Sequence, residues 1–529
     1  MSACRKYHVK CHWDRRSSPS YPSWLLDICD TQDGPAVKLI PIDDNEAEYL
    51  ALSYCWGDGK PPTTTKATLE SRQQDIDWEE LPQTFRDSVR LCRALGFDKL
   101  WIDSLCIVQD DAEARDEELA KMGDIFQCAT LVIIAAEGST PRDGLCVESD
   151  EVARRRWLWS QTTVRYGRPD QEGVKFRNKL HPRQGGEDAC KDDDSTPLPI
   201  AKRAWTYQER LVAQRCLVFR QKEIAWECRS ECKCECSKYV CAYKQQSFPW
   251  SRFVIGGQLS HIHFWGPQDS LQFWDVAVQD YSARKLSRPA DRLPAISALA
   301  RIVETRSIRY LAGLWSTDIV NGLRWKCLLP SDPDTYIPAK EYVAPTWSWA
   351  ACPFPVSYHP TERGKPEDAL IKLVEGKCMP VGANELGQVS DGYLSLHGIH
   401  CGAHAAVGIS KRTGYAELRL VLDNRTIYTL HSDSSEFLWM DGMRVTSRPV
   451  WFDSTRRKLN VLQRVVEPVA GPQISCGGLV RLLWLDERMC LLLAHSLRVD
   501  GAFERLGLLE GDACPRLPEG MPSAAIKLV

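Results

Sequence analysis

The chain has 529 residues, of which 43% are hydrophobic and 26% are charged, as is typical of folded globular proteins with roughly two to four domains. Its 67 basic and 70 acidic residues leave a formal net charge of −3, so no overall field would draw it to nucleic acid or to an anionic membrane. No run approaches the roughly 18–20 apolar residues that a membrane-spanning helix needs. The first residues also lack the apolar stretch of a secretory signal. We therefore expect a cytoplasmic protein.

The N-terminal part, residues 1–47, is predicted to be a hairpin that leads into the main sheet. Residues 24–28 and 36–40 have the composition of short strands, and Asp33-Gly34 is a suitable turn between them.

Two cysteines and two histidines near the start of the chain could be imagined as a zinc site. They are Cys4, His8, Cys11 and His12. Their spacing matches no common zinc finger, so a metal site is not favoured here. Without a secretory signal, cysteines inside apolar runs, such as Cys92, are expected to be reduced and buried.

The segment from residue 49 to residue 144 is the best-patterned part of the chain. The apolar run Tyr49–Gly57 ends at a glycine, which is typical of a buried strand that runs into a loop. A helix is predicted over residues 84–95, with Thr84 as its N-cap and Gly96 as its stop signal.

Three further elements follow in the same segment. Residues 99–107 are predicted to form a second strand, residues 113–127 a polar helix and residues 131–136 a third strand. Alternation of strands and helices predicts an α/β domain with a parallel sheet.

The main domain is predicted to end with a block that returns after an insertion. Residues 166–199 have almost no apolar content, which is typical of a loop or a disordered insertion. Residues 203–219 then carry a helix, on which Trp205 and Glu209 share one face, and a short strand.

A cysteine-rich stretch follows this block, with Cys228, Cys232, Cys234 and Cys236. Thiolates at this density can bind zinc, but C-x-C spacing without a distant second pair is a weak signal. The alternative is a reduced, exposed loop. We assign no metal and keep the four cysteines as weak candidates.

The second half of the chain changes from mixed helix and loop to alternating short strands. A helix is predicted to begin over residues 291–300, and the tryptophans in segments 310–315 and 345–350 are expected to pack in a core. Strands are predicted at 393–398, 418–422 and 479–485, with Asp486-Glu487 as a hairpin turn before 488–493. The predicted parts are an extension (1–47), the main domain (48–235), a mixed helical middle region (236–390) and a β-rich C-terminal domain (391–529).

Several blocks, in order, resemble the fungal heterokaryon-incompatibility (HET) domain. They are Leu52–Gly57 (LSYCWG), Leu81-Pro82, Leu100–Asp111 (LWIDSLCIVQDD), Lys121-Met122 and Arg203–Leu211 (RAWTYQERL). Ala204 stands where the family usually has glycine. The resemblance implies a role in non-self recognition and programmed cell death when genetically different fungal cells fuse.

The HET domain in turn resembles the TIR domain, which has a flavodoxin-like fold with a parallel sheet. Trp205 and Glu209 look like the tryptophan and glutamate of the catalytic helix in NAD-cleaving TIR domains. On this resemblance Glu209 is the catalytic carboxylate and Ser53 lies at the mouth of the site, beyond the carboxyl end of a strand.

The chemistry of NAD⁺ cleavage suits a single carboxylate. Nicotinamide leaves as a neutral group and needs no general acid, so a carboxylate need only stabilise an oxocarbenium-like ribosyl transition state. The candidates for substrate binding are Trp56, Trp101 and Trp205 for a ring, Asp103 for a ribose hydroxyl, and Arg203 and Arg210 for the diphosphate. NAD⁺ would be a substrate, and no cofactor is expected.

Each of these residues also has a structural interpretation. Ser53 could simply end its strand, and the tryptophans could be core. Asp103 could cap the following segment or pair with Arg86 or Lys99. Glu209 and Arg210 could form a solvated helix pair.

Two other function classes stay open. A non-catalytic HET domain could oligomerise and recruit other incompatibility or innate-immunity-like proteins. A zinc-dependent nucleic-acid module built on Cys228 to Cys241 is disfavoured by the neutral charge balance and the irregular spacing. Self-association is expected because a TIR-like site can require two subunits, and no nucleic-acid or membrane partner is expected.

Overall fold

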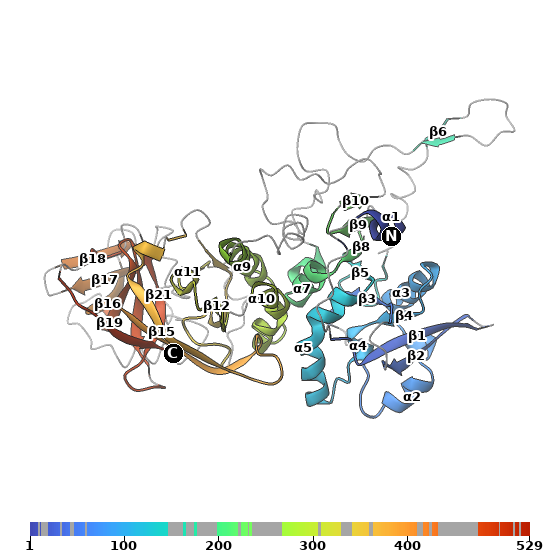
Figure 1. The fold of residues 1–529 in the computed structure, drawn as a ribbon, viewed down its shortest axis with the longest axis horizontal. Coiled ribbons are helices and arrows are strands. Elements are labelled where there is room, and N and C mark those ends of the chain that lie inside the picture. The colour runs from blue at the N-terminus through green and yellow to red at the C-terminus, as the bar shows by residue number, and fades with distance from the viewer. Residues whose placement is uncertain are drawn as a thin grey trace. The chain divides into compact units, whose positions relative to one another are not determined.

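The structure is a computed structural model of the whole chain, which forms two compact units, Met1–Gly266 and Pro267–Val529 (Figure 1). The residues that it describes are 1–8, 11, 20–31, 34–42, 47–58, 61–145, 162–164, 174–176, 198–220, 224–230, 232–234, 267–304, 308–328, 341–358, 363–364, 366–409, 416–422, 426–431, 474–496, 498–510, 514–517 and 520–529. Within these residues, no helix combines the length and the apolar character needed to cross a bilayer.

An eight-stranded sheet organises the first unit, in the order β10-β9-β8-β5-β3-β4-β1-β2. The strands are β1 (Trp24–Thr31), β2 (Gly34–Pro41), β3 (Leu50–Ser53), β4 (Lys99–Trp101), β5 (Leu131–Ala135), β8 (Arg215–Phe219), β9 (Ile224–Cys228) and β10 (Cys232–Cys234). The four central strands β4, β3, β5 and β8 are parallel, and antiparallel strands extend the sheet at both edges. The predicted α/β class with a parallel sheet is confirmed, as is the N-terminal hairpin.

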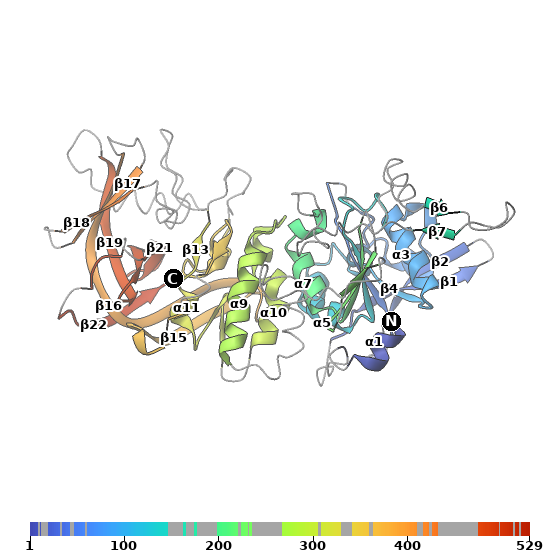
Figure 2. The same cartoon turned by 90° about the horizontal axis from the view of Figure 1, so that it is seen from above.

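Helices cover both faces of this sheet. The longest are α3 (Gln83–Ala94), α5 (Ala112–Cys128) and α7 (Trp205–Val212), and the shorter ones are α1 (Ser2–Tyr7), α2 (Leu69–Gln74), α4 (Asp103–Cys106) and two 3₁₀ turns, Trp78–Glu80 and Pro199–Lys202. Helices α5 and α7 lie on one face and α3 lies on the other (Figures 1 and 2). This follows from the strand order, because the chain leaves β3 for β4 on one side and then crosses to β5 on the other side.

Two details of this region differ from the sequence prediction. The strand predicted over residues 99–107 ends at Trp101, because Asp103 begins the short helix α4 and the following apolar residues are buried around that turn. Helix α3 begins at Gln83, so Thr84 is not its N-cap; the Thr84 hydroxyl instead accepts a hydrogen bond from the Gly144 amide at 3.1 Å. Gly96, with a φ of +82°, follows the last residues of α3 as predicted.

The insertion predicted over residues 166–199 falls largely outside the described residues. Its described part is β7 (Val174–Phe176), which pairs with β6 (Thr162–Val164), and the beginning of the 3₁₀ turn at Pro199.

Helices and tryptophans form the first part of the second unit. Its helices are α9 (Pro267–Ser282), α10 (Ser297–Val303) and α11 (Ile319–Gly322). It also contains 3₁₀ turns at Pro289–Arg292, Pro294–Ile296, Trp349–Ala351 and Pro366–Asp368. Two short strand pairs complete it, β11 (Tyr310–Leu311) with β12 (Leu314–Trp315) and β13 (Lys326–Cys327) with β14 (Val356–Ser357). The indole N–H groups of Trp274 and Trp349 both donate to the Gly313 carbonyl, at 2.9 and 3.0 Å. Trp315, Trp347 and Trp349 are almost completely buried, which confirms the prediction that the tryptophans of segments 310–315 and 345–350 pack in a core.

A barrel-like sheet forms the rest of the second unit, which confirms the β-rich C-terminal region. Its strands are β15 (Ile371–Pro380), β16 (Val389–Ile409), β17 (Ala416–Leu422), β18 (Thr426–His431), β19 (Ile474–Asp486), β20 (Met489–His495), β21 (Phe503–Glu510) and β22 (Ser523–Leu528). The long strand β16 pairs with β22 along its first half and with β19 along its second half, while β19, β20, β21 and β22 pair in succession. The sheet therefore closes on itself. The predicted hairpin before Met489 is present, one residue later than expected.

Candidate functional site

The candidate site lies at the carboxyl end of β3, where the two neighbouring strands are reached by connections in opposite directions. Open α/β sheets bind ligands at such points. Ser53 is the last residue of β3, and its hydroxyl donates a 2.5 Å hydrogen bond to Oε2 of Glu209. Glu209 projects from α7, and only 7% of its surface and 1% of that of Ser53 are exposed. Helix α7 thus brings the Glu209 carboxylate to the end of the first parallel strand.

Burial decides the protonation of this carboxylate. Loss of solvent raises the pKa of Glu209 to about 7, and the nearby Asp103 carboxylate acts in the same direction. The hydrogen bond from Ser53 and the positive charge of Arg203 oppose this effect. Glu209 therefore changes between its neutral and anionic forms close to neutral pH, which suits a catalytic carboxyl group.

A second carboxylate lies at the end of the adjacent strand. Asp103, the first residue of α4, accepts hydrogen bonds from the Trp56 indole at 2.8 Å and from the Ser104 amide at 2.7 Å. Loss of solvent raises the pKa of Asp103, although the Trp56 hydrogen bond and the charge of Arg203 oppose this change. The suggested pairing of Asp103 with Arg86 or Lys99 is wrong, because those two cations bind Glu79 and Asp98.

The loop after β3 is held in place by a cation and a glycine. Arg203, which precedes α7, donates a 2.6 Å hydrogen bond to the Tyr54 carbonyl and so joins the loop to the helix. Gly57 has a φ of +65°, and a Cβ atom there would lie 2.8 Å from the Ser139 carbonyl oxygen. The loop therefore requires glycine at its end.

Residues 49–209 match the family model described as heterokaryon incompatibility protein (HET). Residues 49–209 are therefore a HET domain. Heterokaryon incompatibility protein 6, OR allele, of Neurospora crassa is 31% identical over 133 residues, which are 22% of this chain and 19% of that protein. The chain thus spans about a fifth of the length of this relative. No solved structure matches the chain.

The Ser53–Glu209 contact joins the two ends of the HET domain. Ser53 lies four residues after the start of the matched region, and Glu209 is its last residue. The matched region thus begins just before β3 and ends within α7, and this contact connects these two elements.

The other predicted site residues of the HET domain take separate positions. Trp101 is completely buried and packs edge-on against Phe126, with ring centroids 5.4 Å apart. Arg210 forms a bidentate ion pair with Glu227 on β9, at 2.6 and 3.1 Å. The interpretation of Glu209 and Arg210 as a solvated pair is therefore wrong, because the two side chains bind different partners. Trp205 and Trp56 are partly exposed.

Tyr54 also lies at the candidate site, although no role was predicted for its side chain. The Tyr54 ring is buried edge-on against Phe85, and burial together with the Asp103 charge raises the pKa of its phenol well above the ordinary value. Its position next to Ser53 in the LSYCWG block was the available signal.

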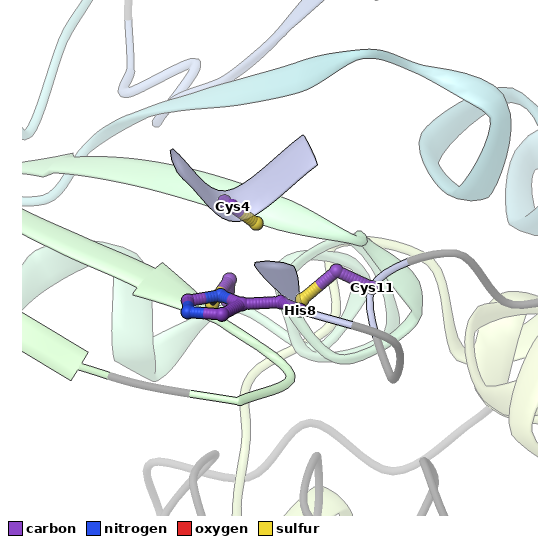
Figure 3. Close-up of side chains that lie close together, drawn as sticks. Cys4, His8 and Cys11 are labelled. Atoms are coloured by element: carbon purple, nitrogen blue, oxygen red, sulfur yellow. Dashed lines mark hydrogen bonds between the residues drawn. The ribbon is translucent and has the colours of Figure 1, made fainter. Parts of the chain in front are cut away.

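A second group of side chains with chemical potential lies outside the matched HET region. The ligand atoms of Cys4, His8, Cys11 and Cys228 all lie within 4.8 Å of one another. Figure 3 shows Cys4, His8 and Cys11 close together. Cys228 is buried at the end of β9, so the interpretation of this cysteine as part of an exposed loop is wrong. The side chains of Cys232, Cys234 and Cys236 lie outside the described part of the chain.

Proposed function

We propose that this HET domain hydrolyses NAD⁺ in the cytoplasm, with Glu209 as the catalytic carboxylate, and that this activity drives fungal incompatibility-linked cell death. The observation that carries the proposal is the buried Ser53–Glu209 pair at the carboxyl end of β3, with the pKa of Glu209 raised to about 7.

The strand order supports a TIR-like, flavodoxin-like core. The parallel strands lie in the order β4-β3-β5-β8, which is the 2-1-3-4 order of flavodoxin-like folds when they are numbered along the chain. The next strand, β9, is antiparallel, whereas the fifth strand of an all-parallel flavodoxin-like sheet would be parallel. The proposal therefore rests on the four central strands and on α7.

The reaction would break the bond between the nicotinamide nitrogen and C1′ of the ribose. The electron pair of that bond goes to the nicotinamide ring, which leaves neutral, and the positive charge develops on the ribose. The Glu209 carboxylate would stabilise this charge, and water would add to C1′ with release of a proton. Asp103 would bind a ribose hydroxyl, and Arg203 would bind the diphosphate.

Access to the pair requires a rearrangement. Ser53 and Glu209 are 1% and 7% exposed, so a substrate cannot reach them without displacement of neighbouring groups. In our proposal, self-association of the chain displaces these groups and so activates the domain.

The same burial favours a second candidate, a non-catalytic platform. In that role Glu209 would hold α7 on the sheet, and the assembled domain would recruit other cell-death proteins. The two candidates differ in what happens when the Glu209 carboxylate becomes an amide of the same shape.

The deciding experiment measures NAD⁺ loss and nicotinamide release by the full chain over a range of protein concentrations. Glu209→Gln is compared with Glu118→Gln, which changes another buried carboxylate of the same unit that binds Ser23. We expect NAD⁺ turnover in the parent and in Glu118→Gln, and a turnover rate at least about 100-fold lower in Glu209→Gln. If no form turns over NAD⁺ while parent and Glu209→Gln kill fungal cells equally, the domain is a platform.

A further inference from the structure

Three cysteines and one histidine from distant parts of the first unit converge at the edge of its sheet. Cys4, Cys11 and Cys228 are 2%, 0% and 4% exposed, and His8 is partly exposed. Their sulfur and nitrogen atoms all lie within 4.8 Å of one another. All three cysteines are thiols. His8 and Cys228 are separated by 220 positions in the chain, so the convergence is a product of the fold.

The spacing of these atoms fits a tetrahedral metal ion. With zinc–sulfur bonds of about 2.3 Å and zinc–nitrogen bonds of about 2.0 Å, tetrahedral geometry places sulfur and nitrogen ligands about 3.5 Å apart and two sulfurs about 3.8 Å apart. The distance between Nδ1 of His8 and Sγ of Cys228 is 3.4 Å. Three thiolates and one imidazole form a Cys₃His set, which is common in structural zinc sites.

Backbone hydrogen bonds link the residues that carry the first three ligands. Cys4 lies in α1, the His8 amide donates to the Cys4 carbonyl at 3.1 Å, and the Cys11 amide donates to the His8 carbonyl at 2.8 Å. The fourth ligand, Cys228, comes from the end of β9, where it pairs with Arg215 of β8. A local turn plus one distant ligand is an arrangement that a metal ion can hold together.

The surroundings of the cluster suit anionic sulfur. Nε of the buried Arg215 donates to Sγ of Cys4 at 3.3 Å, and its Nη2 donates to the Cys11 carbonyl at 3.2 Å. The Ser230 hydroxyl lies 3.6 Å from Sγ of Cys11. Three thiolates and a divalent zinc ion carry one net negative charge, which the Arg215 guanidinium balances. Purely apolar packing of cysteines would not call for an arginine beside the sulfur.

We propose that Cys4, His8, Cys11 and Cys228 bind one structural zinc ion. The ion joins the segment that precedes the HET domain to the strand that follows it, since three ligands come before residue 49 and one comes after residue 209. The anchored strand also supports α7, because Glu227 binds Arg210 and Arg229 donates to the Val212 carbonyl at 3.1 Å. This inference does not rest on NAD⁺ hydrolysis.

The test is the zinc content of the full chain, purified under reducing conditions without a polyhistidine tag or added metal. We expect about one zinc ion per chain in the parent, and a loss of at least about tenfold in Cys11→Ser and in Cys228→Ser. The matched controls are Cys29→Ser, an exposed thiol of the same unit, and the double variant Cys232→Ser/Cys234→Ser. Both are expected to keep the zinc.

A second measurement keeps the inference testable if a ligand variant fails to fold. X-ray absorption at the zinc edge of the parent should show three sulfur neighbours at about 2.3 Å and one nitrogen neighbour at about 2.0 Å. Any one of three results would overturn the assignment. The parent could contain only trace zinc, the reduced preparation could contain a disulfide between Cys4 and Cys11, or the zinc could be lost only in Cys232→Ser/Cys234→Ser.

Discussion

The hydroxyl of Ser53 and the carboxylate of Glu209 share a 2.5 Å hydrogen bond although the residues are 156 positions apart. Ser53 ends the first parallel strand of the HET domain, and Glu209 lies on its last helix. Both side chains are buried, and burial raises the pKa of the Glu209 carboxyl while the hydrogen bond from Ser53 opposes that rise.

Glu209 should make the stability of the first unit depend on pH. Its pKa rises from an ordinary value of 4.5 to about 7 in the folded chain, so the folded state binds the proton more tightly than the unfolded state. The stability that this group contributes is complete below pH 4.5 and is lost as the pH rises through 7, by about 3 kcal/mol in total.

Denaturant unfolding of the parent and of Glu209→Gln between pH 4 and pH 8 measures this effect. The difference in unfolding free energy between the two proteins should change over this interval, with Glu209→Gln gaining on the parent as the pH rises. A difference that stays constant across the interval would show that folding does not raise the pKa of Glu209.

Removal of the Ser53 hydroxyl should raise the pKa of Glu209 further, because the hydrogen bond favours the anionic form. Ser53→Ala should therefore move the pH dependence of stability to higher pH and cost about 1–3 kcal/mol above pH 7. Ser88→Ala is the matched control, since it removes a buried hydroxyl that binds the Thr84 carbonyl within α3. Equal pH profiles for the two variants would contradict the role of Ser53.

Gly57 should tolerate substitution much less well than Gly96. Both have positive φ, +65° and +82°, but a Cβ atom at Gly57 would meet the Ser139 carbonyl at 2.8 Å, whereas Gly96 has open space. We expect Gly96→Ala to cost about 1 kcal/mol from backbone strain alone. Gly57→Ala should cost about 3 kcal/mol, because the loop that carries Trp56 must also shift. Thermal unfolding of both variants measures the difference, and equal losses would show that the loop adapts without cost.

Arg505 should stabilise the second unit from within its core. Only 1% of this side chain is exposed, its guanidinium donates to the Leu323 and Trp325 carbonyls at 2.8 and 2.6 Å, and it lies 3.6 Å from the centre of the Trp325 ring. Arg505→Met should cost about 3 kcal/mol, because two buried carbonyls lose their donor. The exposed Arg488 of the same unit gives the control Arg488→Met, for which denaturant unfolding should show a change within about 0.5 kcal/mol. Similar losses for both variants would contradict the role of Arg505.

Much of the secondary structure could be predicted from local patterns. Helix α3 forms where Phe85, Val89 and Cys92 recur on one face, and all three are buried. The strand predicted over residues 99–107 shows the limit of this reasoning. An apolar run of this length suits either a strand or a buried turn, and the Asp103 carboxylate, which binds the next amide, favours the turn.

The sequence by itself determined the α/β class, the HET blocks and the identity of Ser53, Asp103 and Glu209 as candidates. Only the tertiary structure decided their partners, and it also brought Cys228 to Cys4, His8 and Cys11. The physical reason is the range of the interactions. Periodicity and turn chemistry act between neighbours in the chain, whereas contacts across 156 or 220 positions depend on the order of the strands and on which face each helix covers.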